Sequence, residues 1–164
     1  MDEIPGKHRM VIDTTNSPKF GDGLLFANNF LTANRTDYGL ENKDIAIILV
    51  ARHQSTSLAY SDEMWAKYAA SFAGDLPAEA RTNLPKANPN ATMLASLAKL
   101  GVQVAVCSMA TRRIAGIVAR ATNGNADAIF TELTTHLVAN ARMAPAGIIA
   151  VSRAQERGYT LVTA

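Results

Sequence analysis

The only cysteine in the chain, Cys107, is the residue best placed by type and position for nucleophilic chemistry. It ends an apolar segment, and after four intervening residues the pair Arg112 and Arg113 falls in the first turn of a predicted helix. A helix N-terminus and nearby cations favour the thiolate over the thiol, and the thiolate is the nucleophilic form. The alternative is that Cys107 is an inert buried residue, since cysteine is among the residue types most often buried.

Cys107 and Arg113 also form a C-x5-R pattern, in which Ser108 and Thr111 are candidate binding residues. In tyrosine phosphatases such a loop supplies a nucleophile, backbone N–H groups around an anion and an arginine that clamps its oxygens. The loop here contains no glycine that would let the backbone close around an anion. A phosphatase-like anion site is therefore kept only as an alternative.

Two further polar residues end predicted strands. His53 follows an apolar strand and could donate a proton or contact an anion near Cys107, although a loop histidine bonded locally is the alternative. Asp13 ends the first strand and could complete the cluster, although aspartate is also an ordinary turn residue. The three histidines are scattered and show no metal-binding spacing, so we predict no metal and no organic cofactor.

These residues need a sheet that brings strand ends together, and the apolar pattern predicts one. Apolar runs alternate with helical patterns, which is typical of an α/β fold with a parallel sheet. The strands are predicted at residues 9–15, 44–52, 102–107, 141–144 and 159–163. The helices are predicted at 22–34, after Ser61, at 91–100, from a Thr111 cap onward, at 126–138 and at 147–157. The prediction is a three-layer α/β/α sandwich with a five-stranded, mainly parallel sheet.

Length and composition bound the architecture further. The 164 residues fit one domain, predicted over 1–164, with a Pro-rich loop at about 74–91 that is either a lid or a surface connector. One cysteine excludes an internal disulfide framework and a multi-cysteine metal site within one chain. The formal charge of +2 without a Lys/Arg run argues against direct nucleic-acid binding. The longest apolar run, residues 45–51, is far shorter than the ~18 residues of a membrane helix, so no membrane partner is expected.

Several stretches together resemble the DsrE/DsrF-like family of small sulfur-relay proteins, in an uncharacterised sub-branch. They are RMVIDTT with DGLLFANNFLTA, then ILVARHQSTSLAYSDEMWAKY, then GVQVAVCSMATRRIAG, and finally APAGIIAVSRAQERGYTLVTA. The resemblance implies a parallel five-stranded α/β/α sandwich and assembly as a homo-oligomer, a trimer or a hexamer. It also implies that Cys107 accepts and donates a persulfide sulfur, with Arg112 and Arg113 matching the family's arginine pair.

The leading hypothesis is therefore a persulfide carrier or sulfurtransferase that exchanges sulfur with donor and acceptor proteins. The alternative from another class is a non-catalytic oligomeric binding module in which Cys107 is buried. The first residues are acidic and show no signal-peptide core. A lone cysteine fits a reducing cytoplasm, and it equally fits the mature part of an exported, periplasmic protein.

Overall fold

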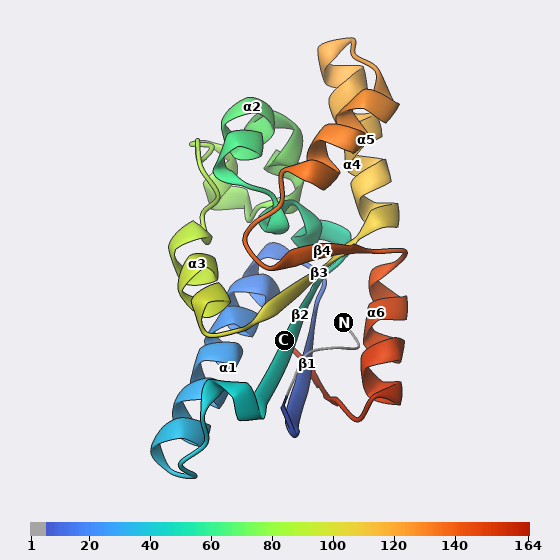
Figure 1. The fold of residues 1–164 in the computed structure, drawn as a ribbon. Helices are drawn as coiled ribbons and strands as arrows, with labels where there is room; N and C mark the ends of the chain where they lie inside the picture. Colours follow the sequence, from blue (N-terminus) through green and yellow to red (C-terminus); the bar gives the residue numbers. More distant parts are fainter. Residues whose placement is uncertain (1–5) are drawn as a thin grey trace.

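The computed structural model describes residues 6–164 as one five-stranded sheet with helices on both faces (Figure 1). All neighbouring strands are parallel, in the order β4-β3-β2-β1-β5. The strands are β1 (His8–Thr14), β2 (Ile45–Ala51), β3 (Gln103–Cys107), β4 (Ala141–Ala144) and β5 (Thr160–Thr163). The predicted α/β class and the five strands are confirmed.

Within residues 6–164, six α-helices connect and flank these strands. They are α1 (Ser17–Thr36), α2 (Asp62–Phe72), α3 (Ala91–Lys99), α4 (Ser108–Thr122), α5 (Ala126–Thr135) and α6 (Gly147–Glu156). Helix α1 starts earlier than predicted, because Asn16 caps it by accepting a hydrogen bond from the backbone N–H of Lys19 at 3.1 Å. Helix α5 ends before residue 138, because Leu137 leaves it to form an antiparallel bridge with Tyr60.

The two faces of the sheet are covered unequally. The larger core joins the sheet to α1, α2, α3, α4 and α5 through side chains such as Phe20, Leu49, Trp65 and Ile114. The second core is small and holds Val11, Val50 and Ala105 against the inner face of α6. Figure 1 shows α6 packed along this side of the sheet. Every residue of β2 is buried, which explains why this strand reads as a continuous apolar run.

The segment at 74–91 is built onto the rest of the fold at a buried asparagine. The Asn88 side-chain amide donates to the carbonyl oxygens of Leu58 and Tyr60, both at 2.7 Å. Its backbone N–H donates to the Asp62 carboxylate at 2.8 Å, at the start of α2. Two short 3-10 helices, Ala73–Asp75 and Ala78–Arg81, occupy the earlier part of the segment. The Pro-rich segment is thus tied to the start of α2.

Candidate active-site cysteine and its surroundings

Three polar residues lie in a row across the carboxyl edge of the sheet, on the face that α6 covers. Strand register places Val11, Val50 and Ala105 on this face, because all three belong to the core beneath α6. Side chains alternate along extended chain, so the residues two positions further on share the face. These are Asp13, Arg52 and Cys107, which follow from β1, β2 and β3 in spatial order. Ligands of parallel α/β sheets bind beyond this edge.

Asp13 and Arg52 form a two-point ion pair within this row. The Arg52 Nε and Nη2 atoms each donate to one oxygen of the Asp13 carboxylate, and both distances are 2.7 Å. The hydrogen bond to Asp13 is the main reason why the pKa of Arg52 is raised above its ordinary value, and the negative charge of a Cys107 thiolate acts in the same direction. Arg52 therefore lies within electrostatic reach of Cys107, while its Nε and Nη2 atoms are bonded to Asp13.

A buried hydroxyl network fixes the strand ends that carry this ion pair. The Ser55 hydroxyl accepts the backbone N–H of Arg52 at 2.9 Å and donates toward the carbonyl oxygen of Thr14 at 3.0 Å. The Thr14 hydroxyl donates to the carbonyl oxygen of Val50 at 2.7 Å. Ser55 and Thr14 are fully buried. The ends of β1 and β2 are consequently held in one arrangement, and with them Asp13 and Arg52.

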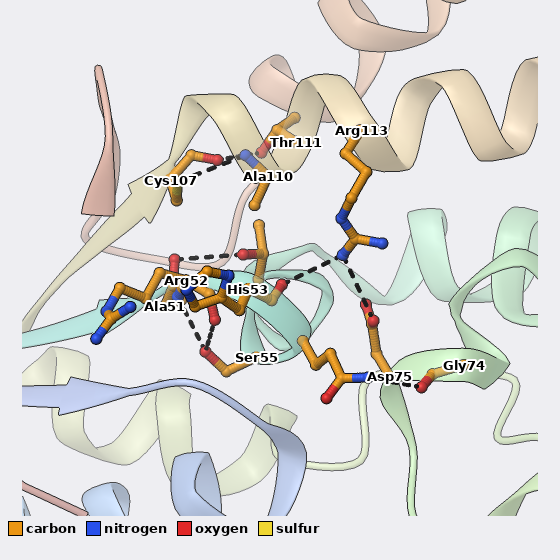
Figure 2. A network of polar contacts seen from close by, with 12 residues as sticks. Ala51, Arg52, His53, Ser55, Gly74, Asp75, Cys107, Ala110, Thr111 and Arg113 are labelled. Carbon is orange, nitrogen blue, oxygen red and sulfur yellow. Dashed lines mark hydrogen bonds and ion pairs between the residues drawn. The ribbon is translucent and has the colours of Figure 1, made fainter. Parts of the chain in front are cut away.

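Cys107 is both the last residue of β3 and the N-cap of α4. Its Sγ accepts a hydrogen bond from the backbone N–H of Ala110 at 3.4 Å, which is the bond a capping side chain makes (Figure 2). No acidic residue lies in the first turn of α4. The residue is buried, with 7% of its surface exposed. A thiolate here would interact favourably with the positive end of the helix dipole.

The expectation that Thr111 caps α4 is wrong. Helix α4 begins at Ser108, a half-buried residue, and Thr111 lies in its first turn. The Thr111 hydroxyl donates to the carbonyl oxygen of Cys107 at 3.0 Å and accepts from the Tyr60 hydroxyl at 2.9 Å. Burial is the main cause that raises the pKa of Tyr60, so the phenol stays protonated and acts as the donor. The hydroxyl chain holds the backbone of Cys107 from the side of the main core.

The arginine pair lies apart from the sulfur. The guanidinium of Arg112 lies 3.6 Å from the centroid of the Phe130 ring, and Nη1 contacts the Asp127 carboxylate at 2.6 Å. Both partners belong to α5, so Arg112 joins α4 to α5. Arg113 points in a different direction from α4, where Nη2 lies 3.4 Å from the carbonyl oxygen of His53 and 3.7 Å from Asp75 Oδ1 (Figure 2). None of these contacts of Arg112 and Arg113 involves the Cys107 sulfur.

His53 lies at the end of β2, as predicted, and opens the 3-10 helix His53–Ala59. Its backbone has a φ of 54°, in the left-handed region that non-glycine residues adopt rarely. Its side chain is exposed, and its carbonyl oxygen accepts from Arg113. In the described contacts, His53 therefore takes part through its backbone.

The sequence analysis did not single out Arg52. It assigned the cation near the thiol to Arg112 and Arg113, whereas in the structure Arg52 is the better candidate for that role. A signal was present, because Arg52 stands two residues after the buried Val50 and directly before His53. Side chains alternate between the two faces of a strand. Had this alternation been extended one residue past the apolar run 45–51, it would have placed Arg52 on the same face as Asp13.

Exposed apolar residues lie on the helix starts at the edge where Cys107 lies. Strands β3 and β4 are neighbours, so α4 and α6 both begin at this edge (Figure 1). Met109 in the first turn of α4 and Ile148 and Ile149 in the first turn of α6 are exposed. Gly147 starts α6 against Arg52, and a Cβ at this position would lie 2.5 Å from the Arg52 Cβ. The start of α6 therefore packs directly on the arginine of the row.

Two kinds of site are missing from the part of the chain that the structure describes. No group of three or more His, Cys, Asp or Glu side chains within residues 6–164 is arranged to hold a metal ion. None of the helices in this range combines the length and the apolar character that crossing a membrane requires.

Comparison with known proteins supports the fold. No family model matches the chain, and no curated protein matches it. Among solved structures, the chain is similar to the protein of unknown function MTH1491 from Methanobacterium thermoautotrophicum, with a TM-score of 0.52 and 15% sequence identity. The match covers 96% of this chain and 100% of MTH1491. At this identity the likeness extends to the architecture of nearly the whole chain and leaves the chemistry to the residues themselves.

Proposed function

We propose that the protein is a sulfur carrier of the DsrE/DsrF-like type, in which Cys107 accepts a sulfane sulfur and passes it on. The observation that carries the proposal is the position of the Cys107 sulfur as the N-cap of α4, where it accepts the Ala110 N–H at the carboxyl edge of a parallel sheet. A helix N-terminus favours the anionic sulfur that this transfer requires.

The transfer needs only a thiolate and a persulfide. The Cys107 thiolate attacks the outer sulfur of a donor persulfide, R–S–SH, and forms a new S–S bond. The bond between the two donor sulfurs breaks, and the donor leaves as the thiolate R–S⁻. Cys107 then carries a persulfide, and an acceptor thiolate removes the outer sulfur by the same exchange in reverse. No electron is gained or lost overall, so one cysteine per chain suffices.

The surroundings of Cys107 suit each stage of this exchange. The Ala110 N–H stabilises the anionic sulfur before attack and again when the acceptor has taken the outer sulfur. Arg52 adds positive charge from the adjacent strand end, and Asp13 holds it in place by two hydrogen bonds. Arg112 and Arg113, whose described partners lie on α5 and at residues 53 and 75, have no part in this proposal.

The partners we propose are proteins and a second copy of this chain. Cys107 is 7% exposed, so a donor must bring its persulfide close to the edge of the sheet. Exposed apolar residues on the first turns of α4 and α6, namely Met109, Ile148 and Ile149, provide a surface on which such a donor could dock. Homo-oligomerisation, as a trimer or a hexamer, belongs to the same proposal and is tested by light scattering of the purified protein.

Mass spectrometry of the intact protein tests the transfer. After exposure to polysulfide, or to a persulfidated donor protein, we expect the mass of one sulfur atom to be added and mapped to Cys107. The adduct should be absent in Cys107→Ser and should form more slowly in Arg52→Met. The control is Arg120→Gln, which removes a cation from an exposed position of α4, the helix that Cys107 caps, and should leave the rate of adduct formation unchanged.

The alternative, a non-catalytic binding module, rests on the burial of Cys107. Iodoacetamide labelling of the native protein near neutral pH separates the two functions. A labelled native thiol that also accepts sulfur supports the carrier. If the native thiol is not labelled and no sulfur is added from any donor, the carrier function is excluded and the binding module stands.

A further inference from the structure

A hollow lies between α4, α2 and the 3-10 helix Ala73–Asp75. It has a volume of about 480 Å³, within the range of about 300–1,000 Å³ that small-molecule sites occupy. Apolar side chains form one wall, and polar groups lie opposite. Its lining residues are Gln54, Ala70, Ser71, Gly74, Asp75, Arg113, Ile114, Ile117 and Ala121.

The polar wall contains a carboxylate that is buried with little compensation. The Asp75 side chain is 8% exposed, and its ion pair within residues 6–164 is with Arg113, at 3.7 Å from Oδ1 to Nη2. A charge-assisted hydrogen bond between such groups is usually about 2.7–2.9 Å long, so the two charges face each other without closing. Burial raises the pKa of Asp75 above its ordinary value, and the nearby Ser57 and Arg113 offset only part of this effect.

Arg113 has donors left for a ligand. Its side chain is 48% exposed, and among residues 6–164 its hydrogen bond is the long one from Nη2 to the carbonyl oxygen of His53. A guanidinium carries five N–H donors in a planar fork that matches a carboxylate. The pocket thus presents the buried Asp75 carboxylate, which can bind a cation, next to the half-exposed Arg113 guanidinium, which can bind an anion (Figure 2).

Adjacent groups of opposite charge select a ligand that carries both charges on neighbouring atoms. An ammonium group would complete the neutralisation of Asp75, which is costly to bury without a close partner. A carboxylate on the next carbon would reach the Arg113 fork. Ile114, Ile117 and Ala121 then offer an apolar wall to whatever the ligand carries beyond these groups. We infer that this pocket binds a free α-amino acid with an apolar side chain, with its ammonium on Asp75 and its carboxylate on Arg113.

Gln54 and Ser71 lie on the rim of the same pocket and supply neutral hydrogen-bonding groups there. The Gln54 amide donates to the carbonyl oxygen of Gly74 at 3.4 Å, a long bond that a ligand oxygen could replace. The inference is independent of the sulfur-carrier proposal, because it uses no property of Cys107.

Isothermal titration calorimetry of the full-length protein with leucine tests the pocket. We expect saturable one-to-one binding to the wild type. Isopentylamine, which lacks the carboxylate, and 4-methylpentanoate, which lacks the ammonium, should each bind at least roughly tenfold more weakly, because each leaves one buried or half-buried charge unpaired. Asp75→Asn and Arg113→Gln should each weaken leucine binding by a similar factor.

Two further variants keep the test decisive. Ala70→Phe places a large side chain on the wall of the pocket and leaves Asp75 and Arg113 unsubstituted, and it should abolish leucine binding. Arg120→Gln, which makes the same change as Arg113→Gln outside the lining, should bind leucine as the wild type does. The inference is overturned if the wild type gives no saturable heat with leucine, if isopentylamine or 4-methylpentanoate binds as tightly as leucine, or if Ala70→Phe binds leucine normally.

Discussion

Asp13 and Arg52 join the ends of β1 and β2 by two parallel hydrogen bonds of 2.7 Å, and this pair lies beside Cys107 on the face that α6 covers. The Asp13 side chain is almost fully buried and Arg52 is largely buried. The arrangement fixes a cation next to the candidate nucleophile, although the price is two charges removed from water.

Removing Arg52 should therefore destabilise the protein through the partner it leaves behind. Arg52→Met leaves the Asp13 carboxylate buried without its cation, and we expect the free energy of unfolding to fall by about 2–4 kcal/mol. The double variant Asp13→Asn/Arg52→Met should lose clearly less than Arg52→Met alone, since it leaves no unpaired charge. Urea unfolding at neutral pH measures both.

The control for this ion pair is Lys43→Gln, which breaks the exposed pair with Glu41 and should not change the unfolding midpoint measurably. Equal losses in Arg52→Met and in the double variant would contradict the account, because they would mean that Arg52 acts through packing alone.

A second prediction concerns the close approach of α6 to Arg52. In Gly147→Ala the new Cβ would lie 2.5 Å from the Arg52 Cβ and 2.9 Å from its Cδ. Either α6 or Arg52 must move, so we expect a loss of about 1–3 kcal/mol in the free energy of unfolding. The sulfur-transfer rate of Cys107 should fall together with stability if Arg52 is the part displaced.

Gly21→Ala is the matched control, since Gly21 lies within α1 and a Cβ there would meet no atom within 4 Å. This substitution should raise stability by about 0.5–1 kcal/mol, because alanine has the higher helix propensity. A Gly147→Ala variant as stable as the wild type would show that the start of α6 can shift freely away from Arg52.

How far the sequence alone could lead is clearest at α4. The apolar run 102–107 predicted a strand that ends at Cys107, and this end is confirmed. The helix predicted from a Thr111 cap onward is also present, but it begins earlier, at Ser108. The direction of Arg112 could not be predicted in this way, because it depends on Asp127 and Phe130, which pack on α4 only in the folded chain. Successive helix positions also point about 100° apart, so two adjacent arginines cannot share one target.

The cap of the same helix shows a second limit. Thr111 has the residue type that caps helices, and cysteine is not among the preferred caps. The chain nevertheless turns into α4 at Cys107, because Thr111 is used by the buried Tyr60 hydroxyl on the other side. Tyr60 lies 51 positions away in the sequence, and no local pattern connects the two residues.

A third prediction tests that hydroxyl chain. Thr111→Val removes the acceptor of the Tyr60 hydroxyl and leaves a buried donor unpaired, so the free energy of unfolding should fall by about 1–3 kcal/mol. The double variant Tyr60→Phe/Thr111→Val removes both polar groups and should recover most of that loss. Thermal unfolding followed by circular dichroism gives both values, and a double variant no better than Thr111→Val would argue that the methyl group of valine, rather than the lost bond, causes the damage.

The last prediction follows from the raised pKa of Asp75. Because its pKa is higher in the folded protein than in the unfolded chain, folding favours the protonated carboxyl. This contribution to stability is fully present below the unfolded pKa of about 4 and is lost as the pH rises through the folded pKa. Asp75→Asn abolishes the titration and leaves Arg113 half-exposed to water. The variant should therefore gain stability relative to the wild type as the pH rises above about 4. Urea unfolding at several pH values measures the difference, and Asp22→Asn at an exposed position of α1 should show no such trend.

If Asp75→Asn is instead less stable than the wild type by a constant amount at every pH, the attraction to Arg113 outweighs the cost of burial. Asp75 is then a structural ion-pair partner rather than a carboxylate available to bind a cation.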